Sequence, residues 1–170
     1  MKPVLVAYAS KYGATAGIAE RIGEVLRDAG LPAEVVPAAK VRDLAPYGAV
    51  VLGSAAYMFR WRKEAAKLLK ALAAEAGRPV WLFSSGPTGE GDTEAFTEGE
   101  KLPKGLIPLA DRIGPRDIAT FGGVLDMAKL NAFERWVMGM MKAKPGDYRN
   151  WEAIDAWARA IAAALLEAGS

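Results

Sequence analysis

The segment that follows the first apolar run most constrains what this chain can fold into. Residues 3–8 form a short strand pattern that leads directly into Ser10-Lys11-Tyr12-Gly13-Ala14-Thr15, and a helical pattern begins near Ala16. Glycine lets the backbone turn tightly there, and the first N–H groups of a helix have no partner within the helix. Because such helix N-termini bind anions, the pattern predicts a phosphate-binding loop. An ordinary strand-to-helix turn capped by Thr15 is the alternative.

Strand and helix patterns alternate along the chain, which predicts an α/β domain with a parallel sheet. The expected strands are residues 3–8, 33–36, 47–53, 79–84 and 117–125, the last of them broken by Gly122 and Gly123. The expected helices are residues 16–29, 61–76 and 151–166, the last of them capped by Asn150. Residues 86–115 are rich in glycine and proline, which indicates a long irregular insertion around a short segment at 105–113.

Five strands in this order, with the phosphate-binding loop after the first, favour a doubly wound sheet with the strand order 2-1-3-4-5 and helices on both faces. The length of 170 residues suits a single domain over residues 1–170. In that order, the loops after the first, third and fourth strands meet at one edge of the sheet. We therefore expect a single ligand site built by residues 10–15, 54–60 and 84–92.

Composition limits the chemistry that such a site can perform. The chain contains no cysteine and no histidine, which excludes thiolate nucleophiles, Ser–His triads and nearly all transition-metal sites, so no metal site is predicted. An organic cofactor would then supply any difficult step. Lysine and arginine number 22 against 20 acidic residues, a balance too even to predict nucleic-acid binding. No apolar run reaches the roughly 18 residues of a membrane span and no secretory leader is apparent, so we expect a cytoplasmic protein.

The first loop resembles the flavodoxin family, because it fits the Ser/Thr-x-x-Gly-x-Thr signature of that family and neither the Walker motif nor G-x-G-x-x-G. The similarity in strand and loop order covers essentially the whole chain. The turn at 11–15 and the tail at 133–162 look most like the menaquinone-dependent protoporphyrinogen oxidase branch. In that tail, Phe133-Glu134-Arg135-Trp136-Val137-Met138-Gly139-Met140-Met141-Lys142 precedes Asp147-Tyr148-Arg149-Asn150-Trp151-Glu152.

The resemblance implies that FMN is the cofactor and that the three loops bind it. In the first loop, backbone amides and the hydroxyls of Ser10 and Thr15 would hold the phosphate, and Lys11 would add charge or simply be solvated. The cofactor-binding residues expected in this loop are Ser10, Lys11, Tyr12, Gly13, Ala14 and Thr15.

The second and third loops would contact the isoalloxazine ring. The residues expected there are Ser54, Ala55, Ala56, Tyr57 and Met58 in the second loop, and Ser84, Ser85, Gly86, Pro87, Thr88, Gly91 and Asp92 in the third. Tyr57 or Phe59 would stack on the ring, whereas the alternative is that these aromatic residues cap the core. The third loop lacks the aromatic residue that flavodoxins commonly place there, and a glycine-rich surface loop is its alternative interpretation.

Residues 127–144 combine basic side chains with an approximate helical stripe of apolar ones. The stripe consists of Leu130, Phe133, Val137, Met140 and Met141, with Trp136 beside it. Such a helix could rest on an anionic membrane surface, cover a hydrophobic substrate or simply contribute to the core. The first of these alternatives would place the protein peripherally at the inner face of the cell membrane.

The function favoured by the resemblance is an FMN-dependent oxidoreductase that oxidises a bulky apolar substrate, with protoporphyrinogen as donor and a quinone as acceptor. Arg60 and Arg62 are the candidate catalytic residues, because their charge and position suit substrate carboxylates. A flavodoxin-type electron carrier is the second hypothesis, although such carriers are typically strongly acidic. A binding module that has lost the flavin is the third. The sequence leaves the oligomeric state open, a homodimer included.

Overall fold

The computed structural model describes residues 1–57, 60–75, 77–88 and 100–169. The strands are β1 (Val4–Ala9), β2 (Ala33–Pro37), β3 (Ala49–Tyr57), β4 (Arg60–Trp61), β5 (Val80–Ser85), β6 (Asp117–Phe121), β7 (Val124–Leu125) and β8 (Gly146–Asp147). The α-helices are α1 (Ala14–Asp28), α2 (Lys63–Ala74), α4 (Ile107–Ile113), α5 (Ala132–Met140) and α6 (Trp151–Ala168). Short 3-10 helices are η1 (Ala38–Lys40), η2 (Lys104–Leu106) and η3 (Met127–Lys129).

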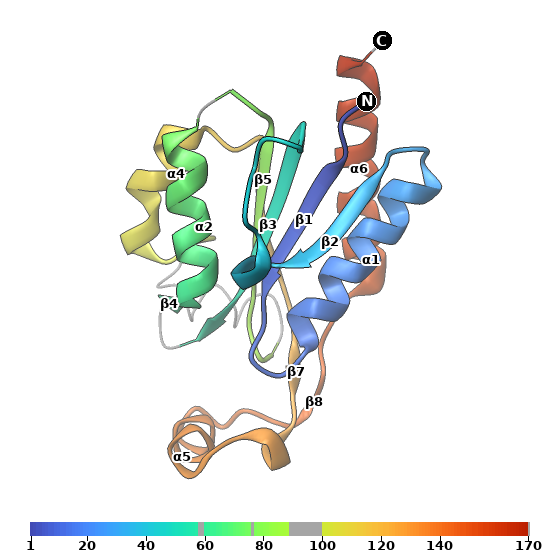
Figure 1. Cartoon of the computed structure of the whole chain (residues 1–170). Coiled ribbons are helices and arrows are strands. Elements are labelled where there is room, and N and C mark those ends of the chain that lie inside the picture. The colour runs from blue at the N-terminus through green and yellow to red at the C-terminus, as the bar shows by residue number, and fades with distance from the viewer. Residues whose placement is uncertain (58–59, 76, 89–99, 170) are drawn as a thin grey trace.

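The main sheet is parallel and has the order β2-β1-β3-β5-β6, which confirms the predicted 2-1-3-4-5 order of the five long strands (Figure 1). β1 lies between β2 and β3, with Val4 opposite both Ala33 and Ala49. The short strand β4 adds an antiparallel pair to β3. The carboxyl ends of β1, β3 and β5 therefore meet at one edge of the sheet, as the doubly wound order requires.

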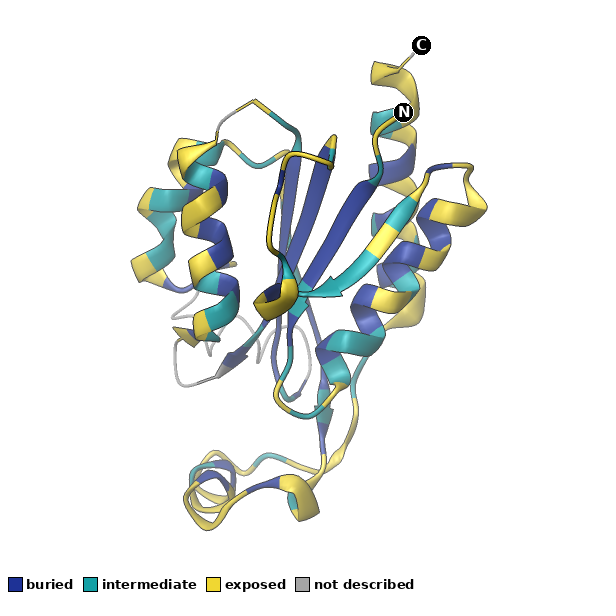
Figure 2. Cartoon of the chain, in the orientation of Figure 1, coloured by how far each residue is buried: buried dark blue, intermediate teal, exposed yellow. Residues whose placement is uncertain are grey.

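Helices cover both faces of the sheet, as expected for a doubly wound fold. In Figure 1, α1 and α6 lie against one face, and α2 and α4 lie against the other. Side chains alternate between the two faces of a strand, so successive residues of β1 enter different halves of the core: Val6 packs under α1 and α6, whereas Leu5 packs under α2. Figure 2 shows the central strands buried and the outer faces of the helices exposed.

The helix predicted for residues 61–76 begins later, at Lys63. Trp61 belongs to β4, where it pairs with Ala56, and its indole N–H donates a 2.8 Å hydrogen bond to the Ser84 hydroxyl. Helical periodicity does not register this tertiary bond, which is why the pattern extends the helix to the apolar Trp61. Helix α1 begins at Ala14, slightly before the predicted start.

The strand predicted for residues 117–125 divides at Gly122 and Gly123. β6 ends at Phe121, and β7 leaves the main sheet to pair with β8 in a separate antiparallel ribbon. The short segment expected at 105–113 within the insertion is helical: it forms η2 and α4, and α4 packs against α2. The central part of the predicted insertion, residues 89–99, lies outside the described residues.

Residues 124–147, which we call the lobe, project beyond the carboxyl edge of the sheet (Figure 1). The ribbon of β7 and β8 connects the lobe to the domain, and α5 lies at its far end. The lobe has a small core of its own, in which Leu125, Leu130 and Met138 are buried. Within the described parts of the chain, no helix is both long and apolar enough to span a bilayer.

Candidate cofactor site

A pocket lies between the carboxyl edge of the sheet and the lobe. Its empty volume is about 680 Å³, a value that includes space open to solvent. From the three predicted loops it is lined by Ser10, Lys11, Tyr12, Ala14, Thr15, Ala55, Ala56, Ser85, Gly86 and Pro87. From the lobe it is lined by Val124, Leu125, Asp126, Lys129, Leu130, Glu134 and Met138. The structure thus brings the three loops together, and it adds a wall from the lobe, which contains the segment for which covering a substrate is one of the three alternatives.

The first loop presents an uncapped helix N-terminus to this pocket. Gly13 has a φ of 93°, a left-handed conformation that glycine adopts without steric cost, and its N–H donates to the Ser10 hydroxyl at 2.9 Å. The N–H of Gly17 donates to Gly13 O at 3.1 Å, the bond that joins the first turn of α1 to its cap residue. The N–H groups of residues 14–16 come before this bond, where a helix has no carbonyl to offer them. Helix α1 has no side-chain cap and no acidic residue in its first turn. This donor set fits a phosphate dianion.

The hydroxyls of Thr15 and Ser85 join the first loop to the third. Their oxygens are 2.7 Å apart in a buried hydrogen bond, although the two residues are 70 positions apart in the chain. Ser10 also uses its hydroxyl within the protein, as the acceptor of the Gly13 N–H. The hydroxyls of Ser10 and Thr15 therefore help to hold the loop in shape, while both residues line the pocket, and their expected contacts with a phosphate stay predictions.

Two other predicted serines lie behind the pocket rather than in it. The fully buried Ser54 hydroxyl accepts the Arg62 N–H at 3.0 Å and donates to Ala55 O at 3.0 Å. The fully buried Ser84 hydroxyl accepts the Trp61 indole N–H and donates to Lys101 O at 2.9 Å. These bonds position β3 and β5, in which the pocket residues Ala55 and Ser85 come next.

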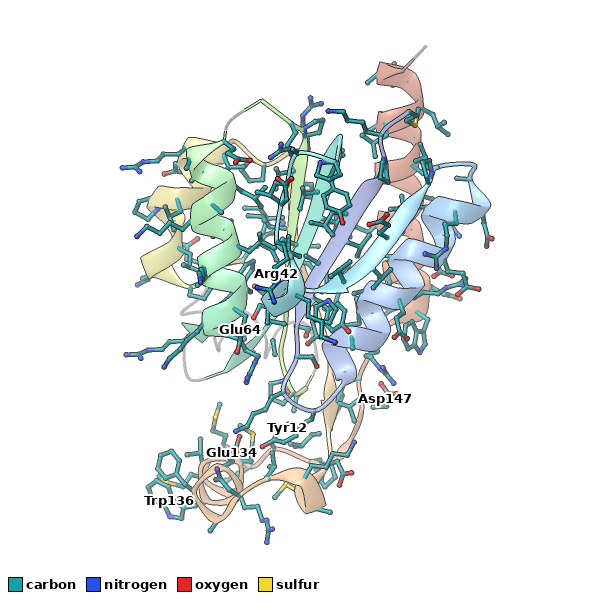
Figure 3. The ribbon with its side chains drawn as sticks, viewed as in Figure 1. Tyr12, Arg42, Glu64, Glu134, Trp136 and Asp147 are labelled. Carbon is teal, nitrogen blue, oxygen red and sulfur yellow. The ribbon has the colours of Figure 1, made fainter. Side chains whose placement is uncertain are left out.

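Glu134 of the lobe binds the first loop. Its carboxylate accepts a 2.9 Å bond from Lys11 Nζ and a 2.6 Å bond from the Tyr12 hydroxyl, and Figure 3 shows Glu134 and Tyr12 facing each other. Glu134 also completes a capping box with Asn131 at the start of α5. The side chain of Glu134 is only 5% exposed, whereas that of Lys11 is 44% exposed. Lys11 is thus ion-paired with Glu134 and also lines the pocket, and its expected contribution to cofactor binding stays a prediction.

This cluster changes the ionisation of its three members. Burial by itself raises the pKa of Glu134, but the hydrogen bonds from Tyr12, Lys11 and Asn131 outweigh it and bring that pKa below 4.5. The hydrogen bond to Glu134 raises the pKa of Lys11 above 10.5. Burial and the bond to Glu134 raise the pKa of Tyr12 above 10.0. The charged carboxylate and ammonium and the neutral phenol are therefore the favoured forms in the folded protein.

Glu134→Gln is expected to destabilise the protein by about 1–3 kcal/mol at neutral pH, because a charged acceptor of several hydrogen bonds is lost. Since the folded pKa of Glu134 is lowered, its contribution is present above the unfolded pKa of about 4.5 and disappears as pH falls through the folded value. The contribution of Lys11 to stability is present at neutral pH and disappears when pH rises through its raised pKa.

Thermal melting between about pH 6 and about pH 3 measures this effect. The melting temperature of Glu134→Gln should fall less steeply with acid than that of the wild type. Glu20→Gln, at an exposed carboxylate on α1, is the matched control and should keep the wild-type slope. Parallel curves for Glu134→Gln and the wild type would contradict the assignment.

Two lobe residues of the pocket, Glu134 and Met138, are functional candidates that the sequence pattern does not single out. The pattern marks residues 127–144 as a segment, but the inward side chains Glu134 and Met138 lie outside its apolar stripe. The signal that could have found them is the spacing from Asn131 to Glu134, which is that of a capping box and places the start of α5. Glu134 and Met138 then share one side of the helix, one turn apart.

Several predicted residues lie elsewhere. Thr88 is buried, and its carbonyl accepts the Gly123 N–H at 3.0 Å. Arg60 is exposed, and Arg62 lines a separate hollow with Tyr8 and Glu64, so the structure does not place either arginine in the described pocket lining. Their catalytic role stays a prediction. The side chain of Tyr57, together with Met58, Phe59, Gly91 and Asp92, lies outside the described residues, so their contacts with a ring also stay predictions.

Comparison with solved structures finds flavodoxins. The chain superposes on a flavodoxin from Streptococcus pneumonia TIGR4 with a TM-score of 0.64 at 16% identity, covering 94% of this chain and 97% of that one. For a cysteine-to-serine mutant of flavodoxin from Pseudomonas aeruginosa the TM-score is 0.60 at 17% identity, and the match covers 96% of this chain and 98% of that one. For a flavodoxin from the domain Archaea the TM-score is 0.57 at 19% identity, and the match covers 83% of this chain and 96% of that one. At these identities the likeness establishes the fold.

Comparison at the level of sequence gives the family. No curated protein matches the chain. The family profile described as the flavodoxin domain matches residues 5–150, a range that contains the three converging loops and the lobe. With this match added to the sheet order and the uncapped N-terminus of α1, the chain belongs to the flavodoxin domain family.

Proposed function

We propose that this protein binds FMN in the pocket between the three loops and the lobe, and that it acts in electron or hydride transfer. The observation that carries the proposal is the uncapped N-terminus of α1, which lies at a pocket that the second loop, the third loop and the lobe also line. Members of the flavodoxin family bind FMN. When bound, FMN would supply the redox chemistry that a chain without cysteine or histidine lacks.

The residues present fit such a ligand. The backbone amides at the start of α1 would bind the phosphate, in the manner usual for helix N-termini. The methyl side chains of Ala55 and Ala56 leave room for a flat ring to approach the backbone of β3, and Gly86 and Pro87 of the third loop also line the pocket. Such contacts let backbone groups bind and orient the polar edge of the ring while the surrounding protein excludes water.

Binding of FMN can be tested at Ala14, which lines the pocket in the first turn of α1. Ala14→Glu should weaken FMN binding at least about tenfold, because a carboxylate there repels the phosphate and occupies the positive end of the helix. Ala14→Lys, of similar size and opposite charge, is the matched control and should bind FMN much more tightly than Ala14→Glu does. Binding is read from quenching of flavin fluorescence on titration of the apoprotein.

The ligand comparison completes this test. Riboflavin, which lacks the phosphate, should bind much more weakly than FMN to the wild type and should not distinguish the two Ala14 variants. Equal affinities of Ala14→Glu and Ala14→Lys for FMN would refute phosphate binding at this loop. A protein that is purified colourless and takes up no added FMN would refute the proposed function as a whole and favour a flavin-free module.

We further propose that the redox partner of the flavin is an apolar small molecule that enters beside the lobe. Leu125, Leu130 and Met138 supply an apolar wall, and Lys129 lies among the polar lining residues. Protoporphyrinogen as donor and a quinone as acceptor are the specific candidates, and they rest on the sequence resemblance of the first loop and the tail. Bleaching of the FMN-loaded protein by protoporphyrinogen without air, followed by reoxidation with a quinone, tests them.

A simple electron carrier is the alternative. Carriers of this family typically dock through strongly acidic surfaces, whereas this chain has a net charge of +2. The charge balance therefore favours a protein with its own substrate. Reduction of the FMN-loaded protein by a redox partner protein, with no bleaching by any apolar donor, would favour the electron carrier instead.

A further inference from the structure

We propose that the outer face of α5 docks on an anionic lipid bilayer. Four large apolar side chains project from this end of the lobe: Phe133 is 58% exposed, Trp136 61%, Met140 67% and Met141 50%. Elsewhere in the described chain, the large hydrophobic residues that are exposed are Met1, Trp151 and Leu166, which do not belong to the lobe. We call the four lobe residues the apolar tip.

Helical geometry separates the apolar tip from the pocket. Phe133, Trp136 and Met140 are spaced by three and four residues, so they share one side of α5, and the ring centroids of Phe133 and Trp136 are 6.0 Å apart. Glu134 and Met138 share the buried side that lines the pocket. Figure 3 shows Trp136 at the outer margin of the lobe, away from the sheet. The predicted stripe is thus divided, with Leu130 buried and Phe133 and Met140 exposed.

Positive charge is concentrated in the segment that carries the tip. Residues 127–144 contain four basic residues and one acidic residue, a net charge of +3, and with the exposed Asp126 and Asp147 the whole lobe has a net charge of +1. The cations Lys129, Arg135, Lys142 and Lys144 are all exposed. The one acidic residue within 127–144, Glu134, is buried and paired with Lys11. A cluster of exposed cations beside aromatic side chains is the arrangement that anionic headgroups attract and that membrane interfaces retain.

Size and shape favour a bilayer over a second copy of the chain or a protein partner. A nine-residue helix is about 14 Å long, so one of its faces offers far less than the roughly 800 Å² that each partner buries in a stable dimer. The lobe projects outward at the end of the molecule, so its tip can enter a soft surface without a matching groove (Figure 1). Protein interfaces are also depleted of lysine, whereas three of the four cations here are lysines.

Docking through the tip would bring the pocket to the membrane. Within α5, the tip residues and the pocket residues Glu134 and Met138 lie on different sides of the helix, so about 10 Å, the diameter of a helix, would separate the bilayer from this part of the pocket. This consequence, unlike docking itself, rests on the proposed function, because it would let a lipid-dissolved redox partner reach the bound FMN.

Co-sedimentation of the full chain with vesicles tests the docking. Vesicles of phosphatidylcholine with phosphatidylglycerol should bind the wild type, and pure phosphatidylcholine should bind it at least about tenfold more weakly. Phe133→Ser with Trp136→Ser should reduce binding to the anionic vesicles at least about tenfold, whereas Leu166→Ser, at an exposed apolar residue of α6, should leave it unchanged. Lys142→Glu with Lys144→Glu should reduce it similarly, and Lys67→Glu with Lys70→Glu on α2 should not.

Three results would overturn the proposal. They are the absence of binding to anionic vesicles, equal binding to neutral and anionic vesicles, and equal loss in the tip variants and their α6 and α2 controls. Light scattering decides whether the tip serves self-association instead: a dimer in solution that Phe133→Ser with Trp136→Ser converts to a monomer would also overturn it. FMN titration of the same variants distinguishes this proposal from the proposed function, because loss of vesicle binding with FMN affinity retained concerns the tip alone.

Discussion

Phe83→Ala is expected to lower the free energy of unfolding by about 3–5 kcal/mol. Phe83 is a fully buried residue of β5, and its ring packs against Phe121 at 5.8 Å and Trp157 at 6.0 Å between centroids. Truncation would leave a cavity where β5, β6 and α6 meet, and neighbours on two different elements cannot both move to fill it. In a domain of this size the melting temperature should fall by about 10 °C or more.

The matched control is Phe133→Ala, the same substitution at a phenylalanine that is 58% exposed on the lobe. It should change stability by no more than about 0.5 kcal/mol. Urea denaturation followed by circular dichroism measures both variants. Because Phe83 lies two residues before the pocket residue Ser85, Phe83→Ala should also weaken FMN binding. Similar losses of stability in the two variants would contradict the close packing around Phe83.

The sheet could be predicted from the sequence because its pattern is local and repeated. Each central strand is a short apolar run next to a helix pattern, and the loop at 10–15 identifies which strand is first. All residues of β5, from Val80 to Ser85, are buried, as expected for a strand covered on both faces. The order of the five long strands follows from that alternation and from the right-handed crossover rule.

The ends of elements were less predictable where a side chain bonds to a distant partner. Trp61 fits the apolar pattern of a helix, but its indole binds Ser84 of β5, and this holds Trp61 in β4. Gly122 and Gly123 indicate a break in a strand. The direction of the chain after that break, however, depends on the pairing of β7 with β8, which are distant in sequence and carry no strong strand pattern.

The candidate site could be predicted only in part, because its side chains also bond to distant partners. The three loops follow from strand order, so the sequence is enough to predict that they converge. It does not fix the roles within them, because a serine hydroxyl can serve a ligand or the framework equally well: Ser54 and Ser84 serve the framework. The orientation of α5 was also hidden, since its apolar residues lie on two sides and only Glu134, bound to Lys11 and Tyr12, shows which side faces the domain.

Gly123→Ala is expected to weaken FMN binding at least about tenfold and to destabilise the protein by about 1–3 kcal/mol. A Cβ atom on Gly123 would overlap the carbonyl oxygen of Gly86, a residue that lines the pocket. This oxygen is backbone, so it cannot rotate away as a flexible side chain would. Two hydrogen bonds hold the contact, from Gly123 N–H to Thr88 O at 3.0 Å and from Tyr148 N–H to Gly123 O at 2.7 Å. Either the third loop or the base of the lobe must therefore move.

Gly139→Ala provides the comparison within the same lobe. Gly139 lies inside α5 with no atom near its missing Cβ, so alanine should stabilise the helix by about 0.5–1 kcal/mol and leave FMN binding unchanged. Flavin fluorescence titration and thermal melting of both variants separate a general effect of added methyl groups from the specific overlap at Gly86. Wild-type affinity and stability in Gly123→Ala would mean that the third loop and the base of the lobe do not touch, and the pocket would then lose its lobe wall.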